Sequence, residues 1–188
     1  MKRIIITPEF EVAHELKTLR DALAIGMMVH IRKKDIEETR RLLKVISFED
    51  RKQVKVHRFV ELAIEYQVGI HLSSKQSAPE NWTGPISKSC HSFVEVESGK
   101  ELDYVFLSPI FDSISKEGYS AAFSEDELSL FLNSTSTCVI ALGGITLDRV
   151  SQVEEMGFDG YAILGDFWNR TLEERSEYLK ELSLEKCA

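Results

Sequence analysis

The chain has 188 residues, 43% hydrophobic and 29% charged, so it can bury one core and does not resemble a disordered protein. Acidic residues outnumber basic ones 31 to 23, and the formal charge of −8 disfavours nucleic-acid binding, which depends on neutralising many phosphates. The three cysteines are dispersed without a CxxC pair, no apolar run reaches about 18 residues, and the N-terminus lacks a signal-like segment. We therefore expect a cytoplasmic protein with reduced thiols that does not enter a membrane.

Short apolar runs alternate with amphipathic stretches along the chain, which is the pattern of repeated strand and helix units around a parallel sheet. Eight of these runs have the length and composition of buried strands. We expect strands at residues 3–7, 27–32, 54–57, 68–72, 86–90, 103–109, 138–143 and 160–164.

Helices are expected between several of these strands. Apolar residues recur at spacings of three and four in two early stretches, Val12, Leu16, Leu19 and Leu23, and then Ile36, Leu42, Leu43 and Ile46. Ser124 followed by three acidic residues predicts a helix N-terminus, and residues 148–156 predict a helix that ends at Gly157. Thr171 with Glu174 predicts the start of a last helix that reaches about residue 182. Residues 73–85 contain glycine and two prolines and predict a loop.

The order of elements predicts an α/β fold with a single domain over residues 1–188, a compact (β/α)8 barrel whose active site lies at the C-terminal face of the strands. Such barrels usually have about 250 residues, so we expect short helices after the third, fourth and fifth strands. An open doubly wound sheet is the alternative, although the chain has no GxGxxG motif to support it.

Polar and basic residues gather just after the expected strands, where side chains from separate barrel strands converge. They are His30, Arg32, Lys34, His57, Arg58, His71, Ser89, His91, Ser113, Ser115, Lys116, Gly143, Gly144 and Gly165. In a chain of charge −8, this many cationic and hydroxyl side chains at one rim predict a site for an anion, with phosphate as the first candidate.

Two stretches sharpen the phosphate prediction. Gly143 and Gly144 end the seventh strand and Gly165 follows the eighth, and these two loops form the usual phosphate site of a barrel, where backbone N–H groups need an open approach. The loop at residues 109–116 adds two hydroxyls and one ammonium that can wrap an anion. The alternative for Gly143 and Gly144 is that they only permit a tight turn. The alternative for residues 109–116 is a loop that is exposed to solvent and binds nothing.

Several motifs in this order resemble the thiamine phosphate synthase/TenI superfamily, over roughly residues 3–168. They are His30-Ile31-Arg32-Lys33-Lys34, Gly69-Ile70-His71-Leu72, Ser89-Cys90-His91-Ser92, residues 103–111 from Asp103 to Phe111, and Gly143-Gly144-Ile145. The resemblance implies a (β/α)8 barrel enzyme of thiamine biosynthesis. Its substrate would be a small phosphorylated molecule, and assembly into a homo-oligomer stays open.

The resemblance also implies a role for individual residues. Ser113, Ser115, Gly144 and the backbone of Leu164 and Gly165 would hold a thiazole phosphate. Arg32, Lys34, Lys116 and Ser89 would match the groups that hold a pyrimidine diphosphate in a synthase. Fixed cations aimed at a departing diphosphate stabilise its developing charge, which agrees with this role. The alternative is a solvated basic cluster at the start of the second helix.

Three departures from the family pattern bear on the reaction. The resemblance expects Gln where His30 stands, Asn-Asp where His57 and Arg58 stand, and a carboxylate after the fourth strand, where residues 73–76 have none. The missing acids would be the ligands of Mg2+, which prefers carboxylate oxygens beside phosphate. A synthase would need Mg2+, whereas a tautomerase of the TenI branch would require no cofactor or metal.

We therefore predict a TenI-like thiazole tautomerase, in which the resemblance gives the proton-transfer role to His91 and histidine has a suitable pKa for it. Lys116 is the other candidate catalytic residue. The alternatives are a thiamine phosphate synthase and a non-catalytic binder of thiazole phosphate that acts as a regulator.

Several other polar and aromatic residues have a simpler expected role. His57 and His71 are first expected to satisfy buried backbone groups, although either could also touch the ligand. Cys90, Cys138 and Phe106 are expected in the core, and Phe111 is expected to pack beside a strand.

Overall fold

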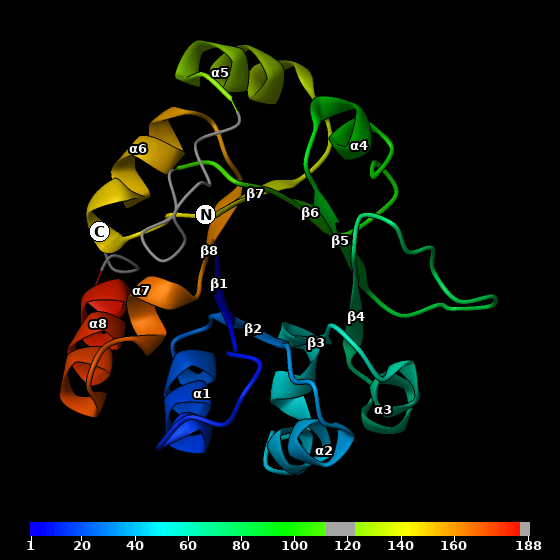
Figure 1. Cartoon of the computed structure of the whole chain (residues 1–188), viewed down its shortest axis with the longest axis vertical. Coiled ribbons are helices and arrows are strands. Elements are labelled where there is room, and N and C mark those ends of the chain that lie inside the picture. The colour runs from blue at the N-terminus through cyan, green and yellow to red at the C-terminus, as the bar shows by residue number, and fades with distance from the viewer. Residues whose placement is uncertain (112–122, 185–188) are drawn as a thin grey trace.

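Eight parallel strands close into a barrel in chain order (Figure 1) in the computed structural model, which describes residues 1–111 and 123–184. The strands are β1 Lys2–Ile6, β2 Met28–Ile31, β3 Val54–Val56, β4 Gly69–Leu72, β5 Ile86–Cys90, β6 Tyr104–Leu107, β7 Val139–Leu142 and β8 Gly160–Ile163. All eight predicted strands are confirmed, and β8 pairs with β1, so the open sheet is excluded.

Helices surround the barrel on its outer face (Figure 1). They are α1 Glu15–Ala24, α2 Ile36–Lys44, α3 Val60–Tyr66, α4 Phe93–Glu97, α5 Glu125–Ser134, α6 Val150–Glu155, α7 Gly165–Trp168 and α8 Leu172–Leu184, with 3-10 turns at Glu49–Gln53 and Leu147–Arg149. The expected shortening is confirmed, since α3 has seven residues, α4 has five, and the described chain runs from β4 to β5 without a helix. Within the two described ranges, no helix has the length and apolar character to cross a membrane.

The predicted helix caps form as expected. Ser124 and Glu127 make a reciprocal capping box at the start of α5. At the start of α8, Thr171 N donates to the Glu174 carboxylate at 2.7 Å and Glu174 N donates to the Thr171 hydroxyl at 3.3 Å. Each box satisfies two backbone N–H groups that the helix itself leaves without partners.

Side chains inside the barrel divide into an apolar part and a polar part. The apolar part is contributed mainly by β1, β6, β7 and β8, and it contains the buried residues Ile4, Ile6, Phe106, Ile140 and Ala162. The polar part comes from β2 to β6 and contains the buried residues His30, Lys55, His71, Ser87 and Tyr104. Because side chains alternate along each strand, these residues are on the barrel side of their strands while their neighbours pack under the helices.

Two of the three cysteines lie in the described part of the chain, and both are free. Cys90 is fully buried, as predicted, and burial raises the pKa of its thiol to about 11. Cys138 is only half-buried and packs against the interior cluster of Ile4 and Phe106. Of the two predicted aromatic core residues, Phe106 is fully buried and Phe111 is half-buried against the core.

Candidate functional site

Three cationic side chains after β2 and β3, here called the basic rim (Arg32, Lys34 and Arg58), surround one carboxylate. Glu9, in the loop after β1, forms ion pairs with Lys34 at 2.8 Å and Arg58 at 3.3 Å. The hydrogen bond from Lys34, together with the charges of Arg32 and Arg58, lowers the pKa of Glu9. Arg32 has no ion pair or side-chain hydrogen bond among the described residues, and its Nε is buried. Of the three cations of the basic rim, Arg32 is therefore the one that forms no ion pair with Glu9 or with any other described residue.

Lys33 lies between two residues of the basic rim but has a different role. It is almost fully buried, pairs with Glu15 of α1 at 2.7 Å and donates to the Phe10 carbonyl at 2.7 Å. This buried pair fixes the loop after β1 against the end of β2. Since neighbouring residues of an extended chain point in opposite directions, burial of Lys33 leaves Arg32 and Lys34 on the other side.

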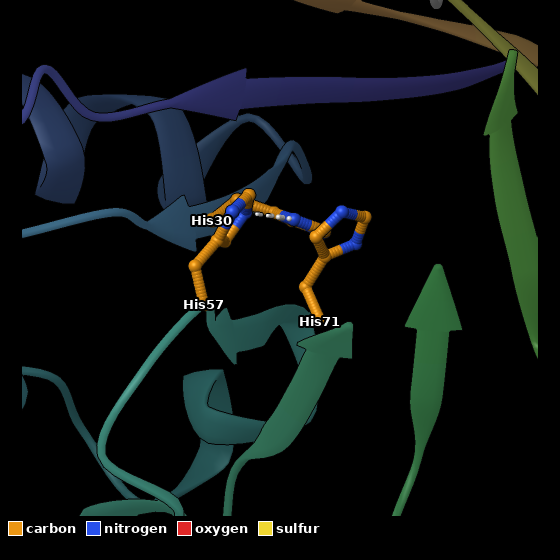
Figure 2. A group of neighbouring side chains, drawn as sticks. All are labelled: His30, His57 and His71. Atoms are coloured by element: carbon orange, nitrogen blue, oxygen red, sulfur yellow. Dashed lines mark hydrogen bonds between the residues drawn. The ribbon is translucent and has the colours of Figure 1, made fainter. Parts of the chain in front are cut away.

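Three histidines from consecutive strands, here called the histidine cluster (His30, His57 and His71), point toward one another inside the barrel (Figure 2). His30 Nδ1 and His57 Nε2 are 2.9 Å apart and share a hydrogen bond, while His30 Nε2 is 2.5 Å from the Tyr104 hydroxyl. His30 and His71 are buried, whereas His57 at the end of β3 is half-buried. The cluster thus leads from the barrel interior toward the mouth.

Serine hydroxyls on β5 hold the third histidine of the cluster. His71 Nδ1 is 2.8 Å from Ser87 Oγ, and His71 Nε2 is 2.9 Å from Ser89 Oγ. Both ring nitrogens are therefore bonded to side chains. The expectation that His57 and His71 satisfy buried backbone groups is wrong, because their hydrogen bonds go to His30 and to the two serines.

All three cluster histidines are held neutral near pH 7. Burial keeps the pKa of His30 and His57 well below the usual value, helped by the neighbouring ring of His71. Burial, followed by the charge of Lys55, lowers the pKa of His71 to about 3. Burial disfavours protonation of these rings, but a neutral ring keeps a lone pair on nitrogen, so the cluster can bind a cation that prefers nitrogen ligands.

A buried ammonium lies beside the cluster. Lys55 Nζ pairs with Asp103 at 2.8 Å and lies 4.9 Å from the ring centre of Tyr104. Burial lowers the pKa of Lys55, although the hydrogen bond that Lys55 donates to Asp103 opposes this effect. Sequence reasoning missed Lys55, Ser87 and Tyr104, because it considered residues that follow the strands rather than those inside them. For Lys55 the available signal was its place between Val54 and Val56 in β3, whereas β5 and β6 show no such alternation.

His91, the predicted proton-transfer residue, follows β5 and is exposed. Its Nδ1 is 3.0 Å from the Ser108 carbonyl oxygen, and its backbone N–H donates to Glu95 at 2.6 Å. A carbonyl oxygen only accepts, so Nδ1 carries a proton and Nε2 is the nitrogen left for proton transfer. The structure therefore presents a base nitrogen on an exposed ring, oriented through its other nitrogen.

The glycines after β7 adopt backbone conformations that favour glycine. Gly143 has a φ of 97° and Gly144 a φ of 67°. A side chain at position 143 would also come within 3.0 Å of Pro109 Cα, and Phe111 N donates to the Gly143 carbonyl at 3.1 Å. Gly143 therefore has a structural reason to be glycine, the packing of two neighbouring loops, which is the simpler of the two alternatives raised by the sequence. Phosphate binding by Gly144 stays a prediction.

The remaining predicted site residues lie in different parts of the barrel mouth, below it, or outside the described residues. Leu164 and Gly165 are half-buried at the junction of β8 and α7, a short helix that the sequence did not predict. Ser113, Ser115 and Lys116 lie outside the described residues. His30, predicted to bind substrate at the rim, is fully buried below it with both nitrogens bonded. The structure therefore places His30 below the rim rather than on it, and its contact with a substrate stays a prediction.

Carboxylate ligands for Mg2+ are missing at the positions where the resemblance expects them. His57 and Arg58 follow β3, and residues 73–76 after β4 contain no acid. Glu9 is already paired with two cations. Across residues 1–111 and 123–184, the histidine cluster is the group of three side chains able to share a metal ion, and its nitrogen donors suit a transition metal. These residues do not fit Mg2+.

Comparison with solved structures supports the barrel along its whole length. A thiamine phosphate pyrophosphorylase from Bacteroides thetaiotaomicron is 31% identical, with a TM-score of 0.82 over 99% of this chain and 96% of its own. A thiamine phosphate pyrophosphorylase from Pyrococcus furiosus is 21% identical with a TM-score of 0.76 and supports the fold alone.

Sequence comparison reaches the same family. A thiamine-phosphate synthase from Limosilactobacillus fermentum is 30% identical over 51% of this chain, and one from Latilactobacillus sakei is 34% identical over 56%. The chain spans 49% and 51% of the length of these two relatives, about half in each case. The family model described as thiamine monophosphate synthase matches residues 3–167, nearly the whole chain. The chain therefore belongs to the thiamine monophosphate synthase family.

Proposed function

We propose that this protein is a thiamine phosphate synthase, which joins a thiazole phosphate to a hydroxymethylpyrimidine diphosphate at the barrel mouth and releases diphosphate. The names of its relatives favour this reaction over the tautomerase reaction that the sequence alone favoured. Since the chain spans about half the length of its curated relatives, their activity is carried over here as a proposal.

The observation that carries this proposal is the guanidinium of Arg32, which has no ion pair within the described part of the chain. Arg32 lies beside two further cations, yet Glu9 pairs with Lys34 and Arg58 and leaves Arg32 without a partner among the described residues. A half-buried guanidinium has several N–H groups in a fixed plane that match phosphate oxygens. In the coupling reaction, negative charge develops on the departing diphosphate, and a fixed cation at that point lowers the barrier.

The basic rim has to supply the positive charge in this proposal, because the described residues do not fit Mg2+. Three cations and one carboxylate leave a local excess of positive charge in a chain that is acidic as a whole. An anion that binds there would also compete with Glu9 for Lys34 and Arg58. The charge of Arg58 would then become available to the ligand.

Incubation of the purified chain with both substrates tests the proposal, with thiamine phosphate quantified by chromatography. The reaction is run with added Mg2+ and with a chelator. Formation of thiamine phosphate well above the uncatalysed rate supports the synthase. Absence of product under both conditions, with the chain folded by circular dichroism, contradicts it.

A thiazole tautomerase is the second candidate, and the geometry of His91 favours it. Its Nε2 is the nitrogen left for proton transfer on an exposed ring that Ser108 orients, which is the arrangement required of a proton-transfer base. This reaction has no diphosphate leaving group, so the missing carboxylates would not impair it. Aromatisation of the thiazole phosphate carboxylate that survives chelation and is lost in His91→Asn would support this candidate.

Binding without reaction is the third outcome of the same experiment. If neither product forms while thiazole phosphate still binds in calorimetry, the protein is a binder of that ligand.

A location in the cytoplasm is part of the proposal and is supported by the free thiols of Cys90 and Cys138.

A further inference from the structure

We propose that the histidine cluster is a binding site for a first-row transition metal ion such as Zn2+ or Co2+, held by His30, His57 and His71. One nitrogen from each ring lies within 4.8 Å of the others, and the three rings converge from three consecutive strands (Figure 2). Three histidines with an open fourth position is a known ligand set for such ions. The inference is independent of which reaction the protein catalyses.

Small movements of the rings would close this site. Ligand nitrogens at about 2.0–2.1 Å from a tetrahedral ion are about 3.3 Å apart. His30 Nδ1 and His57 Nε2 are already 2.9 Å apart, so they need only separate slightly. His71 would have to come closer, and one of its two hydrogen bonds to serine hydroxyls would have to give way to the metal bond.

Hydroxyl groups behind the cluster suit a metal site. A metal-bound histidine usually donates its other ring N–H to a nearby acceptor, which fixes the tautomer and the ring orientation. The Tyr104 hydroxyl is 2.5 Å from His30 Nε2, and Ser87 and Ser89 flank the two nitrogens of His71. On metal binding the His30 proton would lie on Nε2 and point at Tyr104, leaving Nδ1 for the ion. No net proton release is needed from that ring.

The ionisation of the three rings and the charges of their neighbours both affect how the site would bind a metal ion. The rings are neutral near pH 7, because burial holds the pKa of each below its usual value, so protons do not compete with a metal. Lys55, Arg32 and Arg58 are cations close enough to lower these pKa values further, and they oppose a dication. A negatively charged fourth ligand that enters past the half-buried His57 would offset them.

Metal binding to the purified chain tests the proposal directly. The apoprotein is titrated with Zn2+ by calorimetry and with Co2+ by visible absorbance, where tetrahedral coordination gives strong bands. We expect one equivalent of each ion and no competition from Mg2+. His57→Asn is expected to abolish binding, and Tyr104→Phe to weaken it about 10- to 100-fold.

Matched controls make this test decisive. His14→Asn changes an exposed histidine that directly precedes α1 and is not part of the cluster, and this variant is expected to bind one equivalent like the parent. Because Tyr104 is buried and its variant could fold poorly, thermal unfolding of every apoprotein is compared, and Zn2+ is expected to raise the Tm of the parent and of His14→Asn but not of His57→Asn. Unchanged Zn2+ binding by His57→Asn, or no binding by the parent, would overturn the proposal.

Discussion

The two parts of the barrel interior are both buried, but one is filled by apolar side chains and the other by polar and charged side chains. Ile4, Ile140 and Ala162 fill the apolar part with side chains that gain free energy simply by leaving water. His30 and Lys55 in the polar part lose hydration and recover it only through specific partners. Stability is therefore concentrated in the apolar part, whereas the polar part keeps reactive groups buried and held in place by hydrogen bonds.

Truncation in the apolar part should have the largest effect on stability. Ile140 is fully buried, so Ile140→Ala removes apolar contacts and leaves a cavity, at a cost of about 2–5 kcal/mol in the free energy of unfolding. Urea denaturation measures this change. Ile64→Ala, at a residue that is 65% exposed, is the control and should stay within about 0.5 kcal/mol. Equal effects of the two variants would contradict the placement of Ile140 inside the barrel.

Lowering the pH should reduce the free energy of unfolding through the buried histidines of the polar part. The folded pKa of His71 is about 3, below its unfolded value of 6.5, so the unfolded chain binds more protons between these two values. The contribution of His71 is complete above pH 6.5 and is lost as the pH falls toward 3, by about 1.4 kcal/mol per pH unit. Urea titrations between pH 7 and 4.5 should show a shallower slope for His71→Gln than for the parent. An identical slope would show that His71 is not buried as described.

Of the three stability predictions, the loss of one ion-pair partner in the polar part should change the free energy of unfolding least. Asp103→Asn leaves the buried Lys55 ammonium without its ion pair and should cost about 1–3 kcal/mol, because Asp103 itself is half exposed to water. Lys55→Met removes the charge and should be close to neutral. Thermal unfolding of both variants measures the difference. A larger loss in Lys55→Met than in Asp103→Asn would mean that the ammonium stabilises the barrel by another contact.

The barrel itself could be predicted from the sequence because each buried strand is a local apolar run. The prediction of residues 86–90 matches β5 at both ends, and the caps at Ser124 and Thr171 depend on residues three positions away. These signals need no knowledge of the partner strand.

The histidine cluster could not be predicted in the same way. His30, His57 and His71 come from three strands, and their convergence depends on the parallel register that aligns His30 with Lys55 and His71 with Ser87. Register between strands is set by the packing of the whole barrel rather than by local pattern. The pairing of Glu9 with the basic rim was missed for the same reason, since Glu9 follows a different strand.

Thiamine phosphate formation by the parent chain and by Arg32→Gln is the measurement that tests the proposed function most directly. Loss of a fixed cation at a developing negative charge should lower kcat/KM about 100-fold or more. Arg20→Gln, at an exposed position on α1, should match the parent. A parent that forms thiamine phosphate with this difference between the two variants is the predicted result. A parent without coupling activity, or an Arg32→Gln variant as active as the parent, would contradict it.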